Sequence, residues 1–340
     1  MMPIALGRAL NAALHDAMRA DDSVVVFGED VGRLGGVFRV TDGLAREFGD
    51  DRCFDTPLAE SGIVGFALGM AMNGFRPVVE MQFDAFAYPA FEQLASHVAK
   101  TRNRTRGSVG VPMVVRIPYG GGIGGVEHHS DSSEAYYAHT PGLKVVVPAT
   151  VADAYSLLRE AIDDPDPVIF MEPKKLYWSK DELALPARTE PFGTAVVRRS
   201  GTDATLLAYG ACVPVALEAA EAAATDDGRQ LEVIDLRTIV PLDDATIAAS
   251  VRKTGRCVVV AEAAGFASVA AELVARVQER CFHSLAAPVL RVTGWDVPYP
   301  PPIVEAHHLP GVDRILDAVD RLQWDDVPDA RFLETLEAAP

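Results

Sequence analysis

The sequence predicts an α/β fold with two doubly wound domains. Short apolar segments rich in β-branched residues alternate with segments of helical period, and the alternation occurs twice, on either side of a polar stretch. Strands that read as continuous apolar runs are typical of parallel sheets covered by helices on both faces. With 340 residues, 49% of them hydrophobic, the chain is long enough for two domains of ordinary size.

Residues 1–180 are expected to form the first domain. Its strands are predicted at "SVVVFGED", "RPVVEMQF", "VPMVVRIP", "LKVVVPA" and "PVIFMEP". Helical periods lie between them, in residues 54–74, "AYPAFEQLASHVAKTR" and "VADAYSLLREAID". Residues 181–200 are polar and contain proline, which predicts a linker that includes an edge strand.

Residues 201–330 repeat the pattern on a smaller scale. Strands are predicted at "ATLLAYGA", "LEVIDLRTI", "CVVVAEA" and "PVLRVTG", with helical segments between them. We therefore expect a second, smaller doubly wound domain.

Composition limits the partners and the location of the protein. A net charge of −17 argues against a nucleic acid partner, because phosphate binding relies on clustered Lys and Arg. Apolar runs stop well short of the ~20 residues that a membrane span needs, and the N-terminus lacks the basic start of a secretory signal. The four cysteines form no CxxC pair. These features predict a cytoplasmic protein with reduced cysteines and no membrane contact.

The segment "FDTPLAESGIVGFALGMAMNG" (54–74) places a carboxylate, Glu60, next to an apolar, glycine-rich helix. Thr56 and Pro57 are suited to start that helix, as cap and first residue. An acid in a first turn is favoured by the helix dipole, which is an ordinary structural role. Alternatively, Glu60 lies in a poorly solvated cleft that raises its pKa and lets it share a proton with a bound base.

A second segment, "RIPYGGGIGGVEHHSDSSEAYYAH", combines glycines with histidines. Gly120, Gly122 and Gly125 match the dinucleotide-binding pattern GxGxxG after a strand, but the polar residues that follow show no helical period. A flexible loop is the better interpretation. It carries His128 and His129, which suit proton donation or anion stabilisation near a ligand, although ordinary surface histidines and, less readily, a zinc site stay open.

Several motifs together resemble one family over nearly the whole chain. They are "FGEDVGRLGGVFRVTDGL", "DTPLAESGIVGFALGMAMNG", "QFDAFAYPAFEQL", "HSDSSEAYYAHTPGLKVVVPAT", "DPVIFMEPKKLY" and "VIDLRTIVPLD". In this order they resemble the beta subunit of the thiamine-diphosphate-dependent 2-oxo acid dehydrogenases. "GGVFRVT", "GIVGF" and "EAYYAH" are most similar to the branched-chain type. The resemblance implies a pyrimidine-binding N-terminal domain and a transketolase-type C-terminal domain.

The resemblance also implies roles for individual residues. Glu60 would hydrogen-bond a ring nitrogen of the cofactor aminopyrimidine and favour its imino tautomer, a role that a raised pKa would serve. Phe86 would pack on the pyrimidine face, and Leu58 and Gln82 would line the same pocket. His129, rather than His128, would lie near the thiazolium and the incoming lipoyl group and donate a proton during acyl transfer. A monovalent cation such as K⁺ would be bound, largely through carbonyl oxygens, at Ala161, Asp164 and Asp166.

The absence of one motif indicates that the chain needs a partner subunit. Enzymes of this class hold the cofactor diphosphate through Mg²⁺ bound by a GDG…N motif, and the nearest match here, "FGDD" at 48–51, lacks the second glycine. The resemblance therefore implies an alpha subunit that holds Mg²⁺ and the diphosphate, in an alpha2-beta2 heterotetramer. It implies further that the C-terminal domain helps subunits associate and docks the lipoyl-bearing acyltransferase, which the acidic balance of the chain would suit if that partner is basic.

Other functions remain open at this point. Pyruvate or acetoin versions of the same enzyme differ mainly in the substrate pocket, to which the alpha chain contributes. A nicotinamide-dependent dehydrogenase would rely on the weak glycine match. A non-catalytic assembly subunit would use Glu60 only as a helix-end acid.

Overall fold

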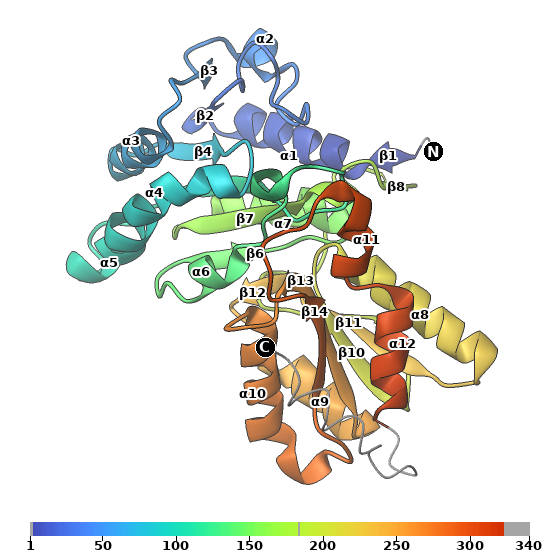
Figure 1. The fold of residues 1–340 in the computed structure, drawn as a ribbon. Helices are drawn as coiled ribbons and strands as arrows, with labels where there is room; N and C mark the ends of the chain where they lie inside the picture. Colours follow the sequence, from blue (N-terminus) through green and yellow to red (C-terminus); the bar gives the residue numbers. More distant parts are fainter. Residues whose placement is uncertain (1–2, 183, 323–340) are drawn as a thin grey trace.

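The computed structural model describes residues 3–182 and 184–322, in which two large sheets are each covered by helices (Figure 1). The N-terminal sheet has seven strands in the order β12-β6-β7-β5-β4-β2-β3. All neighbours are parallel except β12, which runs antiparallel to β6. The strands are β2 (Val24–Gly28), β3 (Cys53–Asp55), β4 (Arg76–Glu80), β5 (Val114–Tyr119), β6 (Lys144–Val146), β7 (Val168–Pro173) and β12 (Thr238–Val240).

Helices lie on both faces of this sheet because its strands are apolar on both sides. Val24 and Val26 of β2 belong to one core cluster, and Val25 and Phe27 belong to the other, as alternation along a strand requires. The first cluster contains the buried faces of α1 and α7, and the second contains those of α3 and α4. The helices are α1 (Leu6–Ala20), α2 (Leu44–Phe48), α3 (Glu60–Met72), α4 (Tyr88–Gln93), α5 (Ala99–Arg104), α6 (Glu134–Ala138) and α7 (Val151–Asp163).

Helix α3 begins later than the sequence predicts. Its first residue is Glu60 and its cap is Ala59, whose backbone is not helical, so the expected start at Thr56 and Pro57 is wrong. The amide of Thr56 donates instead to the carbonyl of Gly28 (2.9 Å), at the end of β2. This bond keeps the chain extended after β3 and brings Glu60 to the edge of the sheet.

The C-terminal sheet has five strands in the order β14-β13-β10-β11-β9. Four are parallel, and β9 is the antiparallel edge strand expected in the linker. The strands are β9 (Val196–Arg199), β10 (Ala204–Ala208), β11 (Leu231–Asp235), β13 (Cys257–Ala264) and β14 (Leu290–Gly294). The helices are α8 (Cys212–Asp226), α9 (Asp244–Thr254), α10 (Val269–Cys281), α11 (Glu305–His308) and α12 (Val312–Asp320). A short pair, β1 (Ile4–Ala5) with β8 (Lys180–Asp181), stands apart from both sheets. The predicted α/β class is confirmed.

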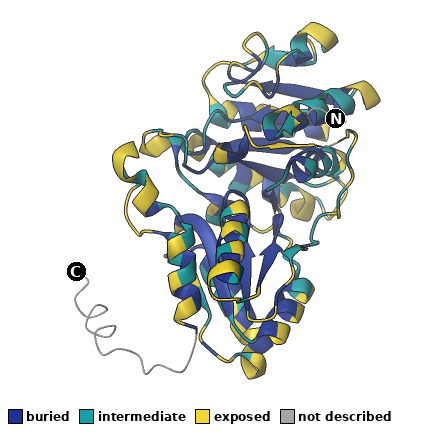
Figure 2. Cartoon of the chain, turned by 90° about the vertical axis from the view of Figure 1, so that its right-hand side faces the viewer, coloured by how far each residue is buried: buried dark blue, intermediate teal, exposed yellow. Residues whose placement is uncertain are grey.

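The two halves are joined by a shared strand and a buried ionic cluster. Strand β12 follows β11 in the chain but pairs with β6 of the N-terminal sheet. Just before it, the fully buried Arg237 donates from Nε to Asp153 of α7 (2.8 Å). Arg198 of β9 bonds both Asp153 and Asp235. One apolar cluster also runs between the sheets, and Figure 2 shows both sheets as dark blue layers between helices with exposed outer faces. The domain boundaries expected from the sequence stay predictions.

None of the helices within the described residues combines the length and the apolar character that crossing a bilayer requires.

Candidate functional site

The predicted site residues follow the carboxyl ends of neighbouring parallel strands. Glu60 comes five residues after β3, Gln82 two residues after β4, and His129 lies on the loop after β5. The register pairs Gly28, the last residue of β2, with Asp55 of β3 and with Glu80 of β4, so these strands end level with one another. Ligands of open α/β sheets bind at this edge. Glu60, Gln82 and His129 therefore lie at the edge where a ligand is expected.

Glu60 lies beside a second acid that the sequence analysis did not single out. Glu29, directly after β2, is 5% exposed, and its Oε1 atom has no hydrogen-bond partner among the described residues. Burial, together with the charge of Glu60, raises the pKa of Glu29. Glu60 itself is half-buried at the first position of α3. A buried carboxyl oxygen that lacks a partner, next to another carboxylate, suits a ligand that offers hydrogen-bond donors, as an aminopyrimidine does.

Gln82 and Leu58 are each close to one member of this acidic pair, Gln82 through a hydrogen bond to the residue after Glu29 and Leu58 through its place in the chain just before Glu60. The amide Nε2 of Gln82 donates to Asp30 (2.9 Å), which follows Glu29 in the chain. Leu58, just before α3, is 82% exposed. In this chain alone Leu58 therefore covers nothing, and its expected place in a cofactor pocket requires a surface from outside the chain.

Phe86 and His129 meet in an aromatic cluster, as the sequence predicted for a shared site. Their ring centroids are 5.4 Å apart. Phe83 contacts both rings: its centroid is 5.6 Å from that of Phe86 and 4.3 Å from that of His129, and its plane is nearly perpendicular to each. Edge-to-face contacts of this kind hold rings in a defined orientation. The imidazole of His129 is thus held by aromatic side chains at the exposed end of the sheet.

The electrostatics favour a neutral His129. Burial lowers its pKa, and the nearby His128 and Lys174 lower it further. Lys174 is fully buried, and burial lowers its pKa to about 8. Its Nζ donates to the carbonyl of Pro118 (3.3 Å) and lies 5.8 Å from the Phe83 ring centroid. A histidine with a pKa near or below its ordinary value can exchange protons with a substrate around neutral pH.

The loop around His129 is anchored on its C-terminal side. The buried carboxyl of Asp84 accepts hydrogen bonds from the amide and hydroxyl of Ser133, at 2.8 and 2.5 Å. Burial raises the pKa of Asp84 to about 7. One turn further along, Tyr88 donates to Asp131 (2.8 Å). Residues after β4 therefore fix residues 131–133, immediately after the histidine.

The glycines before His129 do not form a phosphate-binding turn. The amide of Gly121 donates to Glu262, and that of Gly122 donates to Glu305 (2.9 Å). These carboxylates occupy the donors that a pyrophosphate would need and would repel it. A single 3₁₀ turn, Glu127–His129, follows in place of a long helix. The dinucleotide interpretation thus has no support in the geometry, and the loop, expected to be flexible, is tied to the C-terminal domain.

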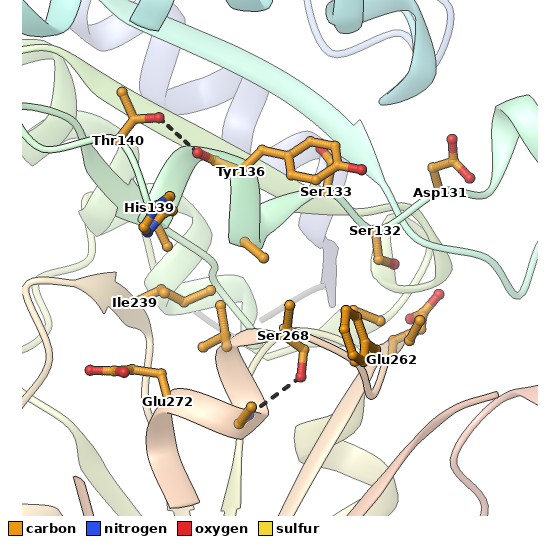
Figure 3. A pocket seen from close by; sticks show the side chains of 18 of the residues that line it. Asp131, Ser132, Ser133, Tyr136, His139, Thr140, Ile239, Glu262, Ser268 and Glu272 are labelled. Carbon is orange, nitrogen blue, oxygen red and sulfur yellow. Dashed lines mark hydrogen bonds between the residues drawn. The ribbon is translucent and has the colours of Figure 1, made fainter. Parts of the chain in front are cut away.

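A cavity of about 1130 Å³ lies between the two domains, next to this loop (Figure 3). Ser130, Asp131, Tyr136 and neighbouring residues line one side, and segments 262–276 and 239–242 line the other. Glu60, Gln82, Phe86 and His129 are not among its lining residues. The acid and aromatic groups argued for above lie instead on the open edge of the sheet. That is the geometry of a half-site, which a second surface must close.

The three predicted cation ligands lie elsewhere. Ala161 is in the last turn of α7, and Asp164 and Asp166 follow that helix, just before β7 begins. They are therefore near the amino ends of the strands, at the opposite edge from His129. Carbonyl groups in the last turn of a helix lack helical partners and attract cations. Within the described residues, no group of three or more His, Cys, Asp or Glu side chains could hold a metal ion.

Cationic side chains already contact this region. Lys144 donates to both carboxyl oxygens of Asp164, at 2.7 and 2.6 Å, and Arg102 donates to Asp166 (2.5 Å). Arg76 donates to the carbonyl of Asp164 (3.3 Å) and to that of Ile162 (2.8 Å). A bound K⁺ would have to use carbonyl oxygens that these side chains leave free.

Comparison with known proteins decides the family. Residues 2–179 match the transketolase pyrimidine-binding domain, and residues 193–315 match the transketolase C-terminal domain. The chain is 57% identical over 315 residues to the 3-methyl-2-oxobutanoate dehydrogenase subunit beta of Mycobacterium tuberculosis, which covers 93% of this chain and 90% of that protein. The chain belongs to the beta subunits of the thiamine-diphosphate-dependent 2-oxo acid dehydrogenases. The resemblance stated from the motifs is thereby confirmed.

Other relatives of this beta-subunit family span both substrate types. The pyruvate dehydrogenase E1 component subunit beta of Leifsonia xyli is 55% identical, covering 92% of this chain and 93% of that protein. The 2-oxoisovalerate dehydrogenase subunit beta of Pseudomonas aeruginosa is 46% identical, with 93% of each chain covered. A solved structure described as a split-gene transketolase, inactive beta4 tetramer, shares the fold with a TM-score of 0.77 at 23% identity, covering 94% of this chain and 98% of that one.

Several residues of the beta-subunit site were not foreseen. Glu29 could have been predicted from the sequence, since a carboxylate directly after an all-apolar strand lies at the ligand edge of the sheet. Phe83 stood within a quoted motif without an assigned role. Lys174, Glu262 and Glu305 carried no signal, because their neighbours in space are far away in the sequence.

Proposed function

We propose that this chain is the beta subunit of a branched-chain 2-oxo acid dehydrogenase, the component that decarboxylates the oxo acids of valine, leucine and isoleucine and passes the acyl group to lipoamide. The observation that carries the proposal is the acidic and aromatic edge of the N-terminal sheet, where Glu29 and Glu60 follow β2 and β3, and the Phe86–His129 cluster follows β4 and β5. The names of the Mycobacterium and Pseudomonas relatives support the branched-chain assignment.

The chain would bind the pyrimidine half of thiamine diphosphate. When bound, this cofactor would supply the nucleophilic carbon and the electron sink for decarboxylation. Glu60 would hydrogen-bond a ring nitrogen, and the buried Glu29, whose pKa is raised by burial and by the charge of Glu60, would lie next to it. Phe86 would cover the ring face, and Leu58 and Gln82 would border it.

His129 would act after decarboxylation. Its imidazole is held by Phe83 and Phe86, and its lowered pKa makes its protonated form a stronger acid. Once protonated, His129 would readily give a proton to the sulfur of the incoming lipoyl group. Exclusion of water around it requires a partner surface, since the site is open in this chain.

An alpha subunit would close the site and hold Mg²⁺ and the diphosphate, in an alpha2-beta2 heterotetramer. Helix α3 supports this, because it leads away from Glu60 and is apolar on its outer side: Phe66 is 55% exposed and Met72 is 52% exposed. An added Cβ at Gly69 would have no atom of the described residues within 4 Å, so another backbone can approach closely there. Exposed apolar surface of this kind marks a subunit interface.

A monovalent cation such as K⁺ is proposed at Ala161, Asp164 and Asp166. It would stabilise the amino-end edge of the sheet and take no part in the chemistry, since His129 lies at the other edge. At equal ionic strength, KCl should raise the unfolding temperature of the chain more than a larger organic cation does. Equal unfolding temperatures in both salts would contradict this site.

The lipoyl-bearing acyltransferase is proposed to dock on the C-terminal domain. The chain carries 48 acidic and 31 basic residues, which would suit a basic docking segment. Reversing exposed acids of this domain should weaken binding to the acyltransferase at low salt. Unchanged affinity would refute the docking site. The cytoplasmic location expected from the sequence stays a prediction.

The pyruvate version is the second candidate, because the Leifsonia relative is almost as similar as the Mycobacterium one. Both are tested by co-expressing the chain with an alpha subunit, purifying the assembly and measuring CO₂ release with 3-methyl-2-oxobutanoate and with pyruvate. The proposal predicts faster turnover of the branched substrate, dependent on thiamine diphosphate and on the alpha subunit. A preference for pyruvate would support the second candidate, and no turnover of any 2-oxo acid would refute both.

A further inference from the structure

We propose that the C-terminal domain is a positioning element of the active site: Glu262, Glu305 and Tyr299 hold the glycine-rich loop that carries His129. This inference rests on the proposed role of His129. It assigns to the C-terminal domain a part in catalysis beyond subunit association and docking.

The loop is closed on itself at its base. It leaves β5 at Gly120 and returns at Asp131, where the amide of Gly120 donates to the carbonyl of Asp131 (2.7 Å). His129 stands on the returning limb, in the 3₁₀ turn Glu127–His129. A Cβ added at Gly125 would lie only 3.2 Å from the Cβ of His129, so the outgoing limb passes close to the histidine, with little free space between them. A displacement of the outgoing limb therefore moves His129.

The C-terminal domain holds the outgoing limb by hydrogen bonds to its backbone. Glu262, at the end of β13 and only 7% exposed, accepts from the amide of Gly121. Glu305, the first residue of α11, accepts from the amide of Gly122 (2.9 Å). The hydroxyl of Tyr299 donates to the same oxygen of Glu305 (2.7 Å) and so fixes that carboxylate. Figure 1 shows α11, in orange-red, beside the N-terminal domain and above the C-terminal sheet.

The close contact between this loop and the C-terminal domain explains why the outgoing limb consists of glycines. A Cβ at Gly121 would lie 1.6 Å from the hydroxyl oxygen of Tyr299, and one at Gly120 would lie 2.9 Å from a carboxyl oxygen of Glu262. Gly120 also has a φ of +79°, which side chains rarely adopt. Residues with side chains would push the loop away from the C-terminal domain. The run of glycines thus permits close approach of the two domains rather than binding of a phosphate.

The histidine loop is therefore fixed at two points that belong to different domains. Asp84 of the N-terminal domain holds Ser133 on the far side, and the glutamates of the C-terminal domain hold Gly121 and Gly122 on the near side. Loss of the near contact would free the outgoing limb without breaking either sheet. The position of His129 then depends on the position of the C-terminal domain relative to the N-terminal domain. The C-terminal domain is thereby coupled to the reaction in which His129 would act.

The test compares Glu305→Ala with Glu305→Gln in the full-length beta chain, without alpha subunit or cofactor. Hydrogen–deuterium exchange is followed in peptides that cover residues 120–133 and in peptides from β10 and β13. Glu305→Ala should raise amide exchange of 120–133 by about ten- to hundredfold, the effect of losing a hydrogen bond to a charged group. Glu305→Gln keeps an oxygen acceptor for Gly122 and should restore most of the protection. Glu279→Ala, an exposed acid of α10, is the matched control.

A second measurement separates positioning from general stability. In histidine-labelled protein, the imidazole signal of His129, assigned by its loss in His129→Asn, should shift in Glu305→Ala and return in Glu305→Gln. Tyr299→Phe should give a smaller shift in the same direction. An unchanged loop and an unchanged His129 signal would overturn the proposal, and so would an equal rise in exchange throughout the C-terminal domain. Because neither readout needs turnover, an inactive assembled enzyme would count against the proposed function and not against this coupling.

Discussion

Replacing the buried Lys174 by methionine should raise the pKa of His129. The Nζ atom of Lys174 is 5.8 Å from the Phe83 ring centroid, which is 4.3 Å from the His129 ring centroid, so the charge lies within about 10 Å of the imidazole. At that distance and an effective dielectric constant of about 40, between those of protein surface and water, Coulomb's law gives about 0.8 kcal/mol. That energy corresponds to about 0.6 pKa unit. Lys174, whose pKa burial lowers to about 8, is mostly charged at pH 7.

The sign follows from the charges. A cation disfavours the protonated imidazole, so its loss lets His129 bind a proton at higher pH. Asp84 would then take up its own proton more readily, since its pKa is already about 7, and this loss of negative charge opposes part of the change. We therefore expect a rise of about half a unit in Lys174→Met, within the range of the Coulomb figure.

The assay is an NMR titration of the His129 imidazole in the full chain. Lys180→Met, a change at an exposed lysine of β8, should leave the titration unaltered. If Lys174→Met lowers stability too far, Lys174→Gln, which also removes the charge but keeps a polar group, should show a rise of similar size. Identical His129 titrations in the wild type and in a folded Lys174→Met or Lys174→Gln variant would refute the electrostatic reasoning.

Three further outcomes are expected. Arg116 is fully buried between Glu80 and Glu172 and bonds them at 2.6 and 2.7 Å. Arg116→Met leaves both carboxylates without this partner and should lower the free energy of unfolding by about 3–5 kcal/mol in urea denaturation. A loss below about 1 kcal/mol would count against this ionic cluster of Arg116, Glu80 and Glu172. Phe66→Lys should cost about 0.5–1.5 kcal/mol of stability, because Phe66 packs edge-to-face on Phe27 with 5.5 Å between the ring centroids, and should abolish co-purification with the alpha subunit; intact assembly of the folded variant would argue against α3 as the interface. Because burial and neighbouring cations lower the pKa of His129 from its ordinary 6.5, single-turnover acyl transfer should rise only as the pH falls below 6.5. A rise centred above pH 7 would be inconsistent with that shift.

The sheets could be predicted from the sequence because their strands are apolar on both faces. Strands β2, β5 and β7 are buried along their whole length, and each had been read from a continuous apolar run. The ligand edge follows from the same pattern, since Glu60, Gln82 and the histidine loop each come after such a run. Periodicity could not fix the start of α3, because the backbone bond from Thr56 to Gly28 connects two strands and leaves no mark in the local sequence.

The remaining features depend on contacts between distant segments. Lys174 directly follows β7, and it comes near Phe83, about ninety residues earlier in the chain, because β7 lies next to β5 in the sheet. In the same way, β12 belongs to the second half of the sequence but to the first sheet. Glu262 reaches Gly121 only because that shared strand and the buried Arg237 hold the halves together. No local pattern encodes these approaches.

The central claim is that Glu60 shares a proton with the pyrimidine ring of a cofactor held between this chain and an alpha subunit. It is tested most directly by decarboxylase activity of the assembled enzyme with Glu60→Gln, beside the exposed control Glu218→Gln on α8. Glu60→Gln is expected to assemble normally but to lose at least about a hundredfold in turnover, as for a proton-transfer partner, while Glu218→Gln should be unchanged. Turnover of Glu60→Gln equal to that of the wild type would contradict it.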